Sequence, residues 1–370
     1  MNGNDSADNT DISIHLSTLH SHLCNFLPAI ERIAVALYQP DSDMLHTYIN
    51  STHGMESPIK HYQVQLESVP SLKSLADSGQ NRCVDDLSVY ESSTKLHSRA
   101  IINAGFKSSF TLPMKVNGNL LGFVFFDSTL VAYFGEAERS YLTLFAQLLF
   151  AYIKHDFSAI QTLRGALRTA SAFGRYRDEE TAEHLIRMSH YSKLLAQCTA
   201  NEFDLSESFI EFIYQFAPLH DIGKIAIPDV VLFKPEKLTE KELVVMKTHV
   251  EKGADMVDMM ISEFGLGTIH NIDILRNIVR YHHERFDGGG YPYGLRAKEI
   301  PVEARIVAVA DVFDALTSSR PYKSAWTLSD TMAHFEKESG GQFDPVCVDA
   351  LNQCLPEFEK IKLRYSASVN

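Results

Sequence analysis

Residues 280–292 read RYHHERFDGGGYP, and residues 217–228 read APLHDIGKIAIP. Each stretch places two adjacent residues with metal-ligating side chains, His282-His283 and His220-Asp221, where a helical pattern gives way to glycine or proline. A single histidine in a helix is more often a surface or core residue than a ligand. These two pairs are therefore evidence for a metal site only if further residues with metal-ligating side chains accompany them.

Four further residues complete such a set. Glu180 and His184 are four apart in RDEETAEH, which puts both on one helix face. His249 lies in MKTHVEKG, and Asp311 lies in the apolar stretch ARIVAVADVFDALT, where a carboxylate is costly unless its charge is compensated. Together these residues offer more ligands than one ion uses, so we expect more than one metal. Imidazole and carboxylate without thiolate favour Fe, Mn or a similar first-row ion, with a carboxylate as bridge.

These residues belong to an ordered series of motifs: R-D-x-E-T-x-x-H, H-D-I-G-K, M-K-x-H, H-H-E-R-x-D-G-x-G-Y-P, the Asp of V-A-D-V-F-D-A-L, and R-P-Y-K. The series resembles the HD-GYP domain, the HD-superfamily branch of cyclic-dinucleotide phosphodiesterases. It runs from about Arg177 to Pro345, with the diagnostic tripeptide intact at 290–292. The resemblance implies an all-helical domain with two or three divalent metals, often iron or manganese. The implied ligands are His184, His220, Asp221, His249, His282, His283 and Asp311, with Glu180 matching a third-metal ligand of some members.

The same resemblance implies roles around the substrate. Asp221 would bridge two ions, and Lys224 would approach the scissile phosphate or the leaving oxygen, its alternative being a solvated helix-end cation. Arg320 and Lys323 would grip the phosphates, since a guanidinium binds two oxygens at once. Gly289 and Gly290 would let the backbone approach a flat substrate. Tyr291 would either stack on a base or pack as a structural ring.

The first 150 residues have a different pattern, typical of an α+β module. A leading helix precedes β-prone runs at 32–38, 45–50, 62–66, 109–116 and 120–127, and helical segments lie at 71–78 and 93–104. Asn117-Gly118 between two β-prone runs predicts a hairpin. The pattern resembles a GAF domain with an antiparallel sheet, expected to serve as a dimerisation platform or a small-ligand sensor. We expect ordinary roles rather than haem or bilin ligation for His53, His61 and Cys83, and His20 is also expected to be an ordinary residue.

A long helix at about 136–170 should connect this module to an all-α domain at 171–370. Its stripe comprises Leu142, Ala146, Leu149, Ile153, Ile160, Leu163 and Leu167. Steps of three and four suit a parallel coiled coil between two protomers, and therefore a homodimer. The alternative, equally open for the first half, is that the stripe packs on its own sheet.

Composition limits the classes of function. The chain has 370 residues, 45% apolar and 22% charged, with a net charge of −13 and no basic block. These values indicate a globular protein and argue against nucleic-acid or anionic-membrane binding. No apolar run approaches the roughly 18 residues of a membrane helix, and the polar, acidic N-terminus does not have the order of a signal peptide. Five widely spread cysteines suggest reduced thiols and a cytoplasmic protein.

We therefore expect a metal-dependent phosphodiesterase regulated by its GAF-like domain. It would hydrolyse cyclic di-GMP, 3′,3′-cyclic GMP-AMP or both to the linear dinucleotide, with further cleavage to mononucleotides left open. One alternative is a non-catalytic signalling protein that binds cyclic dinucleotides or partners, and the intact ligand set argues against it. Another is a different HD-superfamily phosphohydrolase acting on nucleoside phosphates, which the GYP and RPYK segments disfavour.

Overall fold

The computed structural model describes residues 12–40, 42–54, 57–92, 95–174, 182–265, 271–318 and 324–366. Contacts divide the chain into two units, Met1–Phe157 and Ser158–Asn370, and the division falls inside the long helix α4 (Glu136–Gly174). Glu180, Arg320 and Lys323 lie outside the described residues. In the described part, every helix is too short or too polar to span a membrane.

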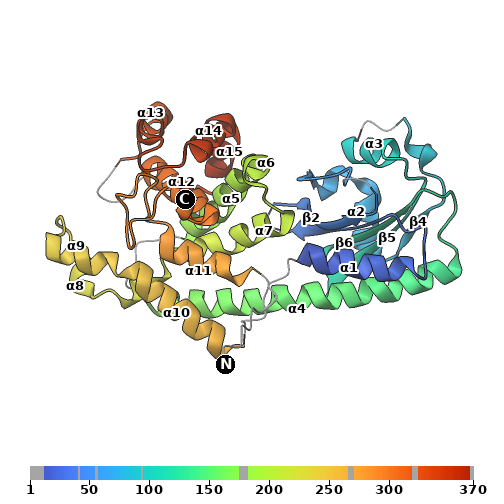
Figure 1. Cartoon of the computed structure of the whole chain (residues 1–370), viewed down its shortest axis with the longest axis horizontal. Coiled ribbons are helices and arrows are strands. Elements are labelled where there is room, and N and C mark those ends of the chain that lie inside the picture. Colours follow the sequence, from blue (N-terminus) through green and yellow to red (C-terminus); the bar gives the residue numbers. More distant parts are fainter. Residues whose placement is uncertain are drawn as a thin grey trace, which may run out of the picture. The chain divides into compact units, whose positions relative to one another are not determined.

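The first unit is built on a six-stranded sheet in the order β3-β2-β1-β6-β5-β4, with every neighbouring pair antiparallel. Four of its strands, β2, β4, β5 and β6, are labelled in Figure 1. The predicted hairpin is confirmed: Asn117 and Gly118 both have positive φ, 50° and 85°, and join β5 to β6. Such angles match the twist of the flanking strands and favour an Asn-Gly pair. The strands are β1 Arg32–Gln39, β2 Met44–Thr52, β3 Gln63–Gln65, β4 Arg82–Val84, β5 Ser108–Val116 and β6 Asn119–Ser128.

Helices cover both faces of this sheet. Alternate residues of β1 point to opposite faces, so Val35 packs with α1 (Ile12–Cys24) and α4, whereas Ala36 packs with α2 (Pro70–Ser78). The short helices η1 (Leu66–Ser68), η2 (Leu87–Tyr90) and α3 (Leu96–Asn103) lie in the connections between strands. The α+β architecture and the antiparallel sheet are therefore confirmed.

In the first half of α4, the apolar stripe packs on the unit's own sheet, which was one of the two packings that the sequence left open. Leu142, Ala146, Leu149 and Ile153 are buried against the unit's own sheet. They are not available for a coiled-coil seam between protomers, so the coiled-coil interpretation is wrong for this half. Ile160 is buried in the core of the second unit, and the side chains of Leu163 and Leu167 lie outside the described residues.

In its described residues the second unit consists of helices joined by loops, and two isolated β-bridges are its only extended pairing. Its helices pack around α5, whose Tyr191 contacts Phe313 and Phe358 in the core. Helix α9 begins with a capping box in which the Thr239 hydroxyl and the Glu242 carboxylate bind each other's backbone N–H. The helices are α5 Ala182–Cys198, α6 Ala200–Phe203, α7 Glu207–Phe216, η3 Ala217–Leu219, η4 Ile222–Ala226, α8 Asp229–Leu232, α9 Glu240–Lys247, α10 His249–Glu263, α11 Ile272–Tyr281, η6 Ala297–Glu299, α12 Val302–Thr317, α13 Leu328–Glu338, α14 Pro345–Gln353 and α15 Leu355–Arg364.

Cys198 and Cys354 form a disulfide between the end of α5 and the junction of α14 with α15. The expectation that all five cysteines are reduced thiols is therefore wrong for this pair. The two residues are separated by 156 positions, so nothing in their local spacing indicated the bond. Cys24, Cys83 and Cys347 are free thiols.

Candidate metal centre

A close approach between two glycines, Gly223 and Gly253, brings η4 and α10 together. A Cβ on Gly223 would lie 1.9 Å from the His249 carbonyl oxygen and 2.5 Å from the Gly253 backbone nitrogen. Only glycine permits this contact, and it seats η4 directly on α10. As a result, Asp221 at the start of η4 meets His249 at the start of α10.

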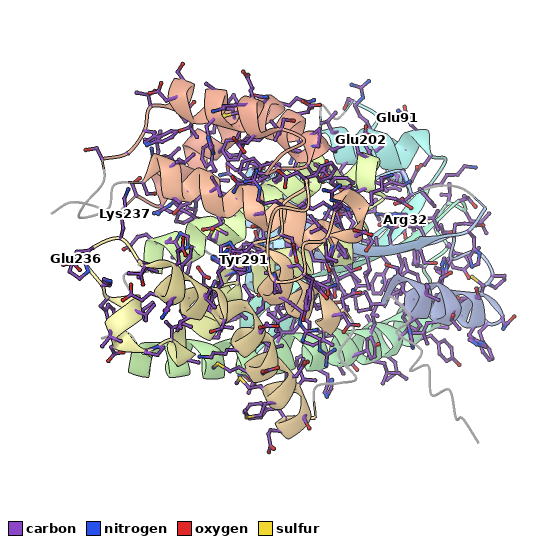
Figure 2. The ribbon with its side chains drawn as sticks, turned by 60° about the vertical axis from the view of Figure 1, so that its left-hand side comes forward. Arg32, Glu91, Glu202, Glu236, Lys237 and Tyr291 are labelled. Carbon is purple, nitrogen blue, oxygen red and sulfur yellow. A yellow bond between two sulfur atoms is a disulfide. The ribbon has the colours of Figure 1, made fainter. Side chains whose placement is uncertain are left out.

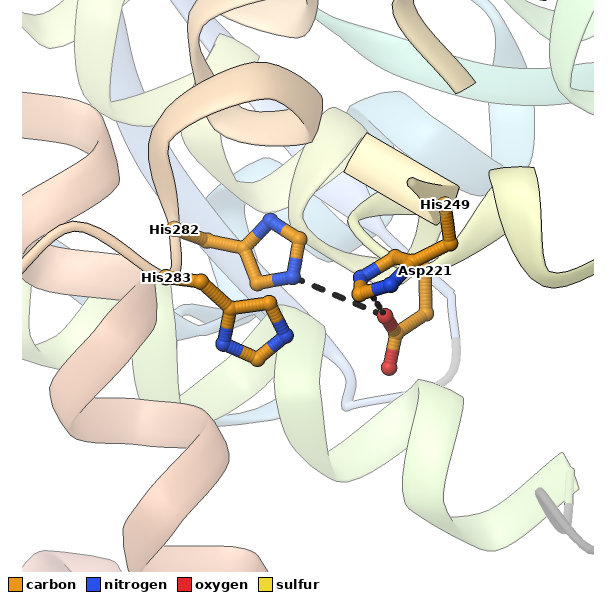
Figure 3. Close-up of side chains that lie close together, drawn as sticks. All are labelled: Asp221, His249, His282 and His283. Atoms are coloured by element: carbon orange, nitrogen blue, oxygen red, sulfur yellow. Dashed lines mark ion pairs between the residues drawn. The ribbon is translucent and has the colours of Figure 1, made fainter. Parts of the chain in front are cut away.

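Asp221 belongs to one of two clusters of candidate ligands and also contacts the other. The first comprises Asp221, His249, His282 and His283, and the second comprises His184, His220 and Asp311. Asp221 Oδ1 lies 3.1 Å from His249 Nε2 and 3.5 Å from His282 Nε2. Dashed lines mark both contacts in Figure 3. Asp221 Oδ2 lies 3.2 Å from His220 Nε2, which is also 3.7 Å from Asp311 Oδ1. One carboxylate therefore contacts both clusters, with one oxygen turned to each.

Backbone carbonyls orient three of the imidazole rings. Nδ1 of His220, His249 and His282 lies 2.8–2.9 Å from the carbonyl oxygens of Ala217, Met246 and Ile278 respectively. A carbonyl only accepts, so Nδ1 carries the proton in each ring and Nε2 presents its lone pair to the cluster. Second-shell bonds of this kind fix the tautomer of metal-bound histidines.

Several atoms of the cluster lack the partner that a cation would provide. Nε2 of His249, Nε2 of His282 and Oδ1 of Asp221 are buried without a hydrogen-bond partner, and such groups are rare in folded proteins. Burial lowers the pKa of His282 and of His283, so both rings are neutral near pH 7 and offer lone pairs. Burial alone would raise the pKa of Asp221, but Lys224 and His220 outweigh it and hold that pKa well below its ordinary value. The donor set fits divalent cations.

His184 is held by two residues that the sequence analysis missed. Its Nδ1 lies 2.7 Å from Asp314 Oδ2, and Arg187 binds both oxygens of the same carboxylate at 2.6 and 2.9 Å. Asp314 lies one helical turn after Asp311 on α12. The cost of a carboxylate in an apolar helix, the argument that identified Asp311, applied equally to Asp314.

The loop between α11 and η6 carries the GYP tripeptide over the cluster. Tyr291 stacks on His283 with ring centroids 4.8 Å apart, and the Lys247 ammonium lies 4.8 Å from the Tyr291 ring centroid (the residue is labelled in Figure 2). Glu284 accepts hydrogen bonds from the Tyr293 and Leu295 backbone N–H groups, which shapes the loop. A Cβ on Gly290 would lie 2.3 Å from the Arg285 nitrogen, so this glycine is required by the loop's own packing.

The structure thus brings together seven of the eight expected ligands, all except Glu180, which lies outside the described residues. Lys224 also reaches the cluster, with Nζ 2.7 Å from Asp221 Oδ2. Arg320 and Lys323, expected at the substrate phosphates, lie outside the described residues as well.

The second unit is thus a helical unit in which a His-Asp pair joins histidines and carboxylates from several helices in two candidate metal-binding clusters. In agreement, the family model described as "HD domain" matches residues 179–347. The second unit of this chain therefore contains an HD domain.

Curated relatives share this half of the chain. The cyclic di-GMP phosphodiesterase response regulator RpfG of Xanthomonas campestris is 48% identical over 52% of this chain and 48% of its own length. A cyclic di-GMP phosphodiesterase of Vibrio cholerae is 43% identical over 50% of this chain and 38% of its own. The 3′3′-cGAMP-specific phosphodiesterase 2 of the same species is 37% identical, with 50% and 34% covered. The chain thus spans about half or less of these relatives.

The first unit has structural neighbours among GAF domains. The GAF domain of an Acinetobacter phosphoenolpyruvate-protein phosphotransferase covers 40% of this chain and 87% of its own, with 16% identity and a TM-score of 0.31. At this score the likeness says nothing about what the first unit binds.

Proposed function

We propose that the chain is a metal-dependent phosphodiesterase that hydrolyses a cyclic dinucleotide, cyclic di-GMP or 3′,3′-cyclic GMP-AMP, to the linear dinucleotide. The observation that carries this proposal is the Asp221 carboxylate, shared between two clusters of buried imidazole and carboxylate groups. The names of the relatives supply the substrate class. The overall reaction adds water across one P–O ester bond, and the departing ribose oxygen takes a proton.

The candidate ligands would bind two cations. His249, His282, His283 and Asp221 would hold one cation, and His184, His220, Asp311 and Asp221 a second, with Fe or Mn as the proposed metals. When bound, two such ions lower the pKa of water and stabilise charge on the phosphoryl oxygens. Glu180 is the proposed ligand of a third ion.

The side chains around the centre would bind and orient the substrate. Lys224 would exchange its contact with Asp221 for the scissile phosphate or the leaving oxygen, where its charge is most useful in the transition state. Arg320 and Lys323 would hold the remaining phosphate oxygens. Tyr291, already stacked on His283, would present its hydroxyl to a base, or its other face once the Lys247 ammonium leaves the ring.

A substrate panel tests this function. The full chain, loaded with Fe²⁺ or Mn²⁺ under anaerobic reducing conditions, should convert cyclic di-GMP, cyclic GMP-AMP or both to linear products detected by chromatography. Asp221→Ala should lose metal and fall to background turnover, whereas Asp255→Ala, an exposed carboxylate on α10, should behave as wild type. Binding without turnover would favour the non-catalytic alternative, and turnover of nucleoside phosphates alone would favour the other HD phosphohydrolase.

For the first unit we propose a regulatory role through a ligand cavity between the sheet and the α2–α3 side. The cavity measures about 430 Å³ and is lined largely by apolar side chains such as Val64, Leu72 and Phe125. Arg82 faces it with Nε buried and without a hydrogen-bond partner, while Nη2 donates to the Thr111 hydroxyl at 3.4 Å. Burial desolvates this guanidinium, and the nearby Asp127 carboxylate is paired with Arg32, so an anion with an apolar body would suit the cavity.

Small carboxylates test this role directly. Benzoate or hexanoate should raise the melting temperature of the full chain and change its turnover, and Arg82→Gln should abolish both effects. Arg99→Gln, an exposed arginine on α3, serves as the matched control. An equal response in the two variants would remove Arg82 from the proposal, and no response in wild type would leave dimerisation as the role of this unit.

A further inference from the structure

The fold brings together three potential metal ligands in the first unit, far from the HD motifs in sequence. His20 and Cys24 lie one turn apart on α1, so they share a face, and His53 follows the last residue of β2. One ligand atom from each of the three lies within 4.8 Å of the other two. The His20 and His53 ring centroids are 4.2 Å apart.

From this cluster we infer that His20, Cys24 and His53 form a binding site for a thiophilic divalent cation, Zn²⁺ foremost. The sequence predicted ordinary roles for both histidines, because no local motif joins α1 to the end of β2. The site shares no residue with the HD-domain clusters, and it does not depend on the function proposed above.

The hydrogen bonds of His20 leave one ring nitrogen with a lone pair. Nε2 lies 2.9 Å from the Ile30 carbonyl oxygen, which only accepts, so Nε2 carries the proton. Nδ1 lies 2.8 Å from the Ser51 hydroxyl and is therefore the unprotonated nitrogen. A hydroxyl can rotate away when a cation takes its place. Metal-bound histidines show this arrangement, with the second ring nitrogen donating to a backbone carbonyl.

His53 has a nitrogen that needs a partner. Its Nε2 is buried and makes no hydrogen bond, a state that folded proteins rarely leave uncompensated. The backbone nitrogen of His53 donates to the Glu31 carbonyl at 2.9 Å, which fixes the residue at the end of the sheet. A cation at this position would give Nε2 the partner that the protein itself does not provide.

Cys24 supplies the feature that selects the metal. Its Sγ donates to the Ile30 carbonyl at 3.3 Å, so the thiol already points to the same backbone group as His20. Two imidazoles and one thiolate suit Zn²⁺, with water as fourth ligand. Bond lengths of about 2.0–2.3 Å would place the ligand atoms about 3.3–3.8 Å apart, and side-chain rotation closes the difference from the present spacing.

The charge around the site also favours a cation. Burial and the nearby Glu31 carboxylate raise the pKa of the Cys24 thiol, and burial lowers the pKa of His20 to about 4. Binding of a cation with Cys24 as thiolate ligand releases the thiol proton. The bound ion would tie α1 to the end of β2 and would offset the charges of the thiolate and Glu31.

Cobalt substitution distinguishes this site from the HD-domain clusters, which contain no cysteine. Co²⁺ added anaerobically to the full chain should produce a thiolate-to-cobalt charge-transfer band in the near ultraviolet, and Zn²⁺ should remove it. Cys24→Ser should abolish the band. Cys83→Ser, a half-buried free thiol on β4 of the same unit, should leave it intact.

A second variant guards against loss of fold. His53→Asn should weaken Co²⁺ binding at this site by more than about tenfold while circular dichroism remains that of wild type. It should also reduce the rise in melting temperature that Zn²⁺ causes. If wild type shows no charge-transfer band, or if the band survives in Cys24→Ser, the proposed site is wrong. Cobalt affinity unchanged in His53→Asn would remove His53 from it.

Discussion

His184 Nδ1 donates a hydrogen bond to Asp314 Oδ2 at 2.7 Å, and Arg187 holds the same carboxylate through two of its nitrogens. The bond turns Nε2 of His184 toward His220 and Asp311, with which it forms the second cluster. Asp314 is 2% exposed, so its charge is compensated entirely from within the protein. The position of a proposed metal ligand on α5 thus depends on a carboxylate of α12.

Asp314→Asn tests this positioning role. The amide keeps the shape of the side chain but removes the charge that orients His184, so metal affinity of the second cluster should fall by about 10–100-fold. Metal titration should show the loss at one ion, with the first cluster retained. Asp349→Asn, an exposed aspartate on α14, is the control. Unchanged affinity for both ions would restrict Asp314 to a structural role.

Gly223→Ala should separate η4 from α10. The added Cβ would overlap the His249 carbonyl oxygen and the Gly253 backbone, and overpacking of this kind costs about 1–3 kcal/mol. Thermal unfolding should therefore occur at lower temperature, and metal binding should weaken because Asp221 and His249 move apart. Gly165→Ala in α4 meets no atom within 4 Å and should be neutral or stabilising. Equal melting temperatures for the two variants would contradict the close approach.

Glu242 gives the stability a defined pH dependence. The Lys234 ammonium and the Thr239 cap lower its pKa from 4.5 to about 2. A folded-state pKa below the unfolded value means that the stabilisation is present above pH 4.5 and is lost as pH falls toward 2. The melting temperature of Glu242→Gln should thus lie below that of wild type at neutral pH, and the gap should shrink on acidification below pH 4.5. A gap that stays constant or widens would contradict this assignment.

An exposed apolar stripe in the first half of α4 is a candidate for a homodimer contact. Tyr141, Leu144 and Leu148 are 66%, 58% and 66% exposed, whereas the neighbouring Leu149 is buried against the sheet. We expect Leu144→Glu with Leu148→Glu to shift the chain toward monomer in light scattering, because charge is costly in an apolar interface. Gln147→Glu on the same helix should not. A dimer that persists in the double variant would place the interface elsewhere.

The sequence predicted those features whose signal is local. The Asn117-Gly118 hairpin, the helical second unit and the grouping of seven candidate ligands all follow from short motifs or from periodicity. The face of α4 was ambiguous because a heptad seam and a sheet-packing stripe have the same spacing. In the structure, Leu149 and Ile153 are buried against the sheet, which identifies the stripe as a sheet-packing face and not as a coiled-coil seam. The sequence alone does not show this contact.

Other features depend on contacts between distant segments. Asp314 and Arg187 are separated by 127 positions, and the Cys198–Cys354 disulfide by 156. The cluster of His20, Cys24 and His53 requires α1 to lie beside the end of β2. Residue types alone did not separate these partners from the many other histidines, cysteines and aspartates of the chain. Three-dimensional proximity was the missing information.

Lys224 and Arg320 should have separable effects on catalysis. Lys224 Nζ lies 2.7 Å from Asp221 Oδ2, and its proposed contact strengthens as charge develops on the leaving oxygen, so Lys224→Ala should mainly lower kcat. Arg320→Ala should raise KM and lower kcat, because a phosphate clamp both binds and orients the scissile bond. Loss of one charge-assisted bidentate contact costs about 1.5–3 kcal/mol, or about one to two decades in kcat/KM.

Steady-state kinetics on metal-replete protein decide this last prediction, with metal content measured in the same samples. Neither variant should lose metal, since neither residue is a proposed ligand. Lys237→Ala removes an exposed cation in the loop before α9 (Figure 2) and should match wild type in both constants. If Lys224→Ala and Arg320→Ala also match wild type, both residues are surface cations and the substrate phosphates are held elsewhere. If Lys224→Ala instead loses metal, its contact with Asp221 supports the centre itself, and its role is to position the bridging carboxylate.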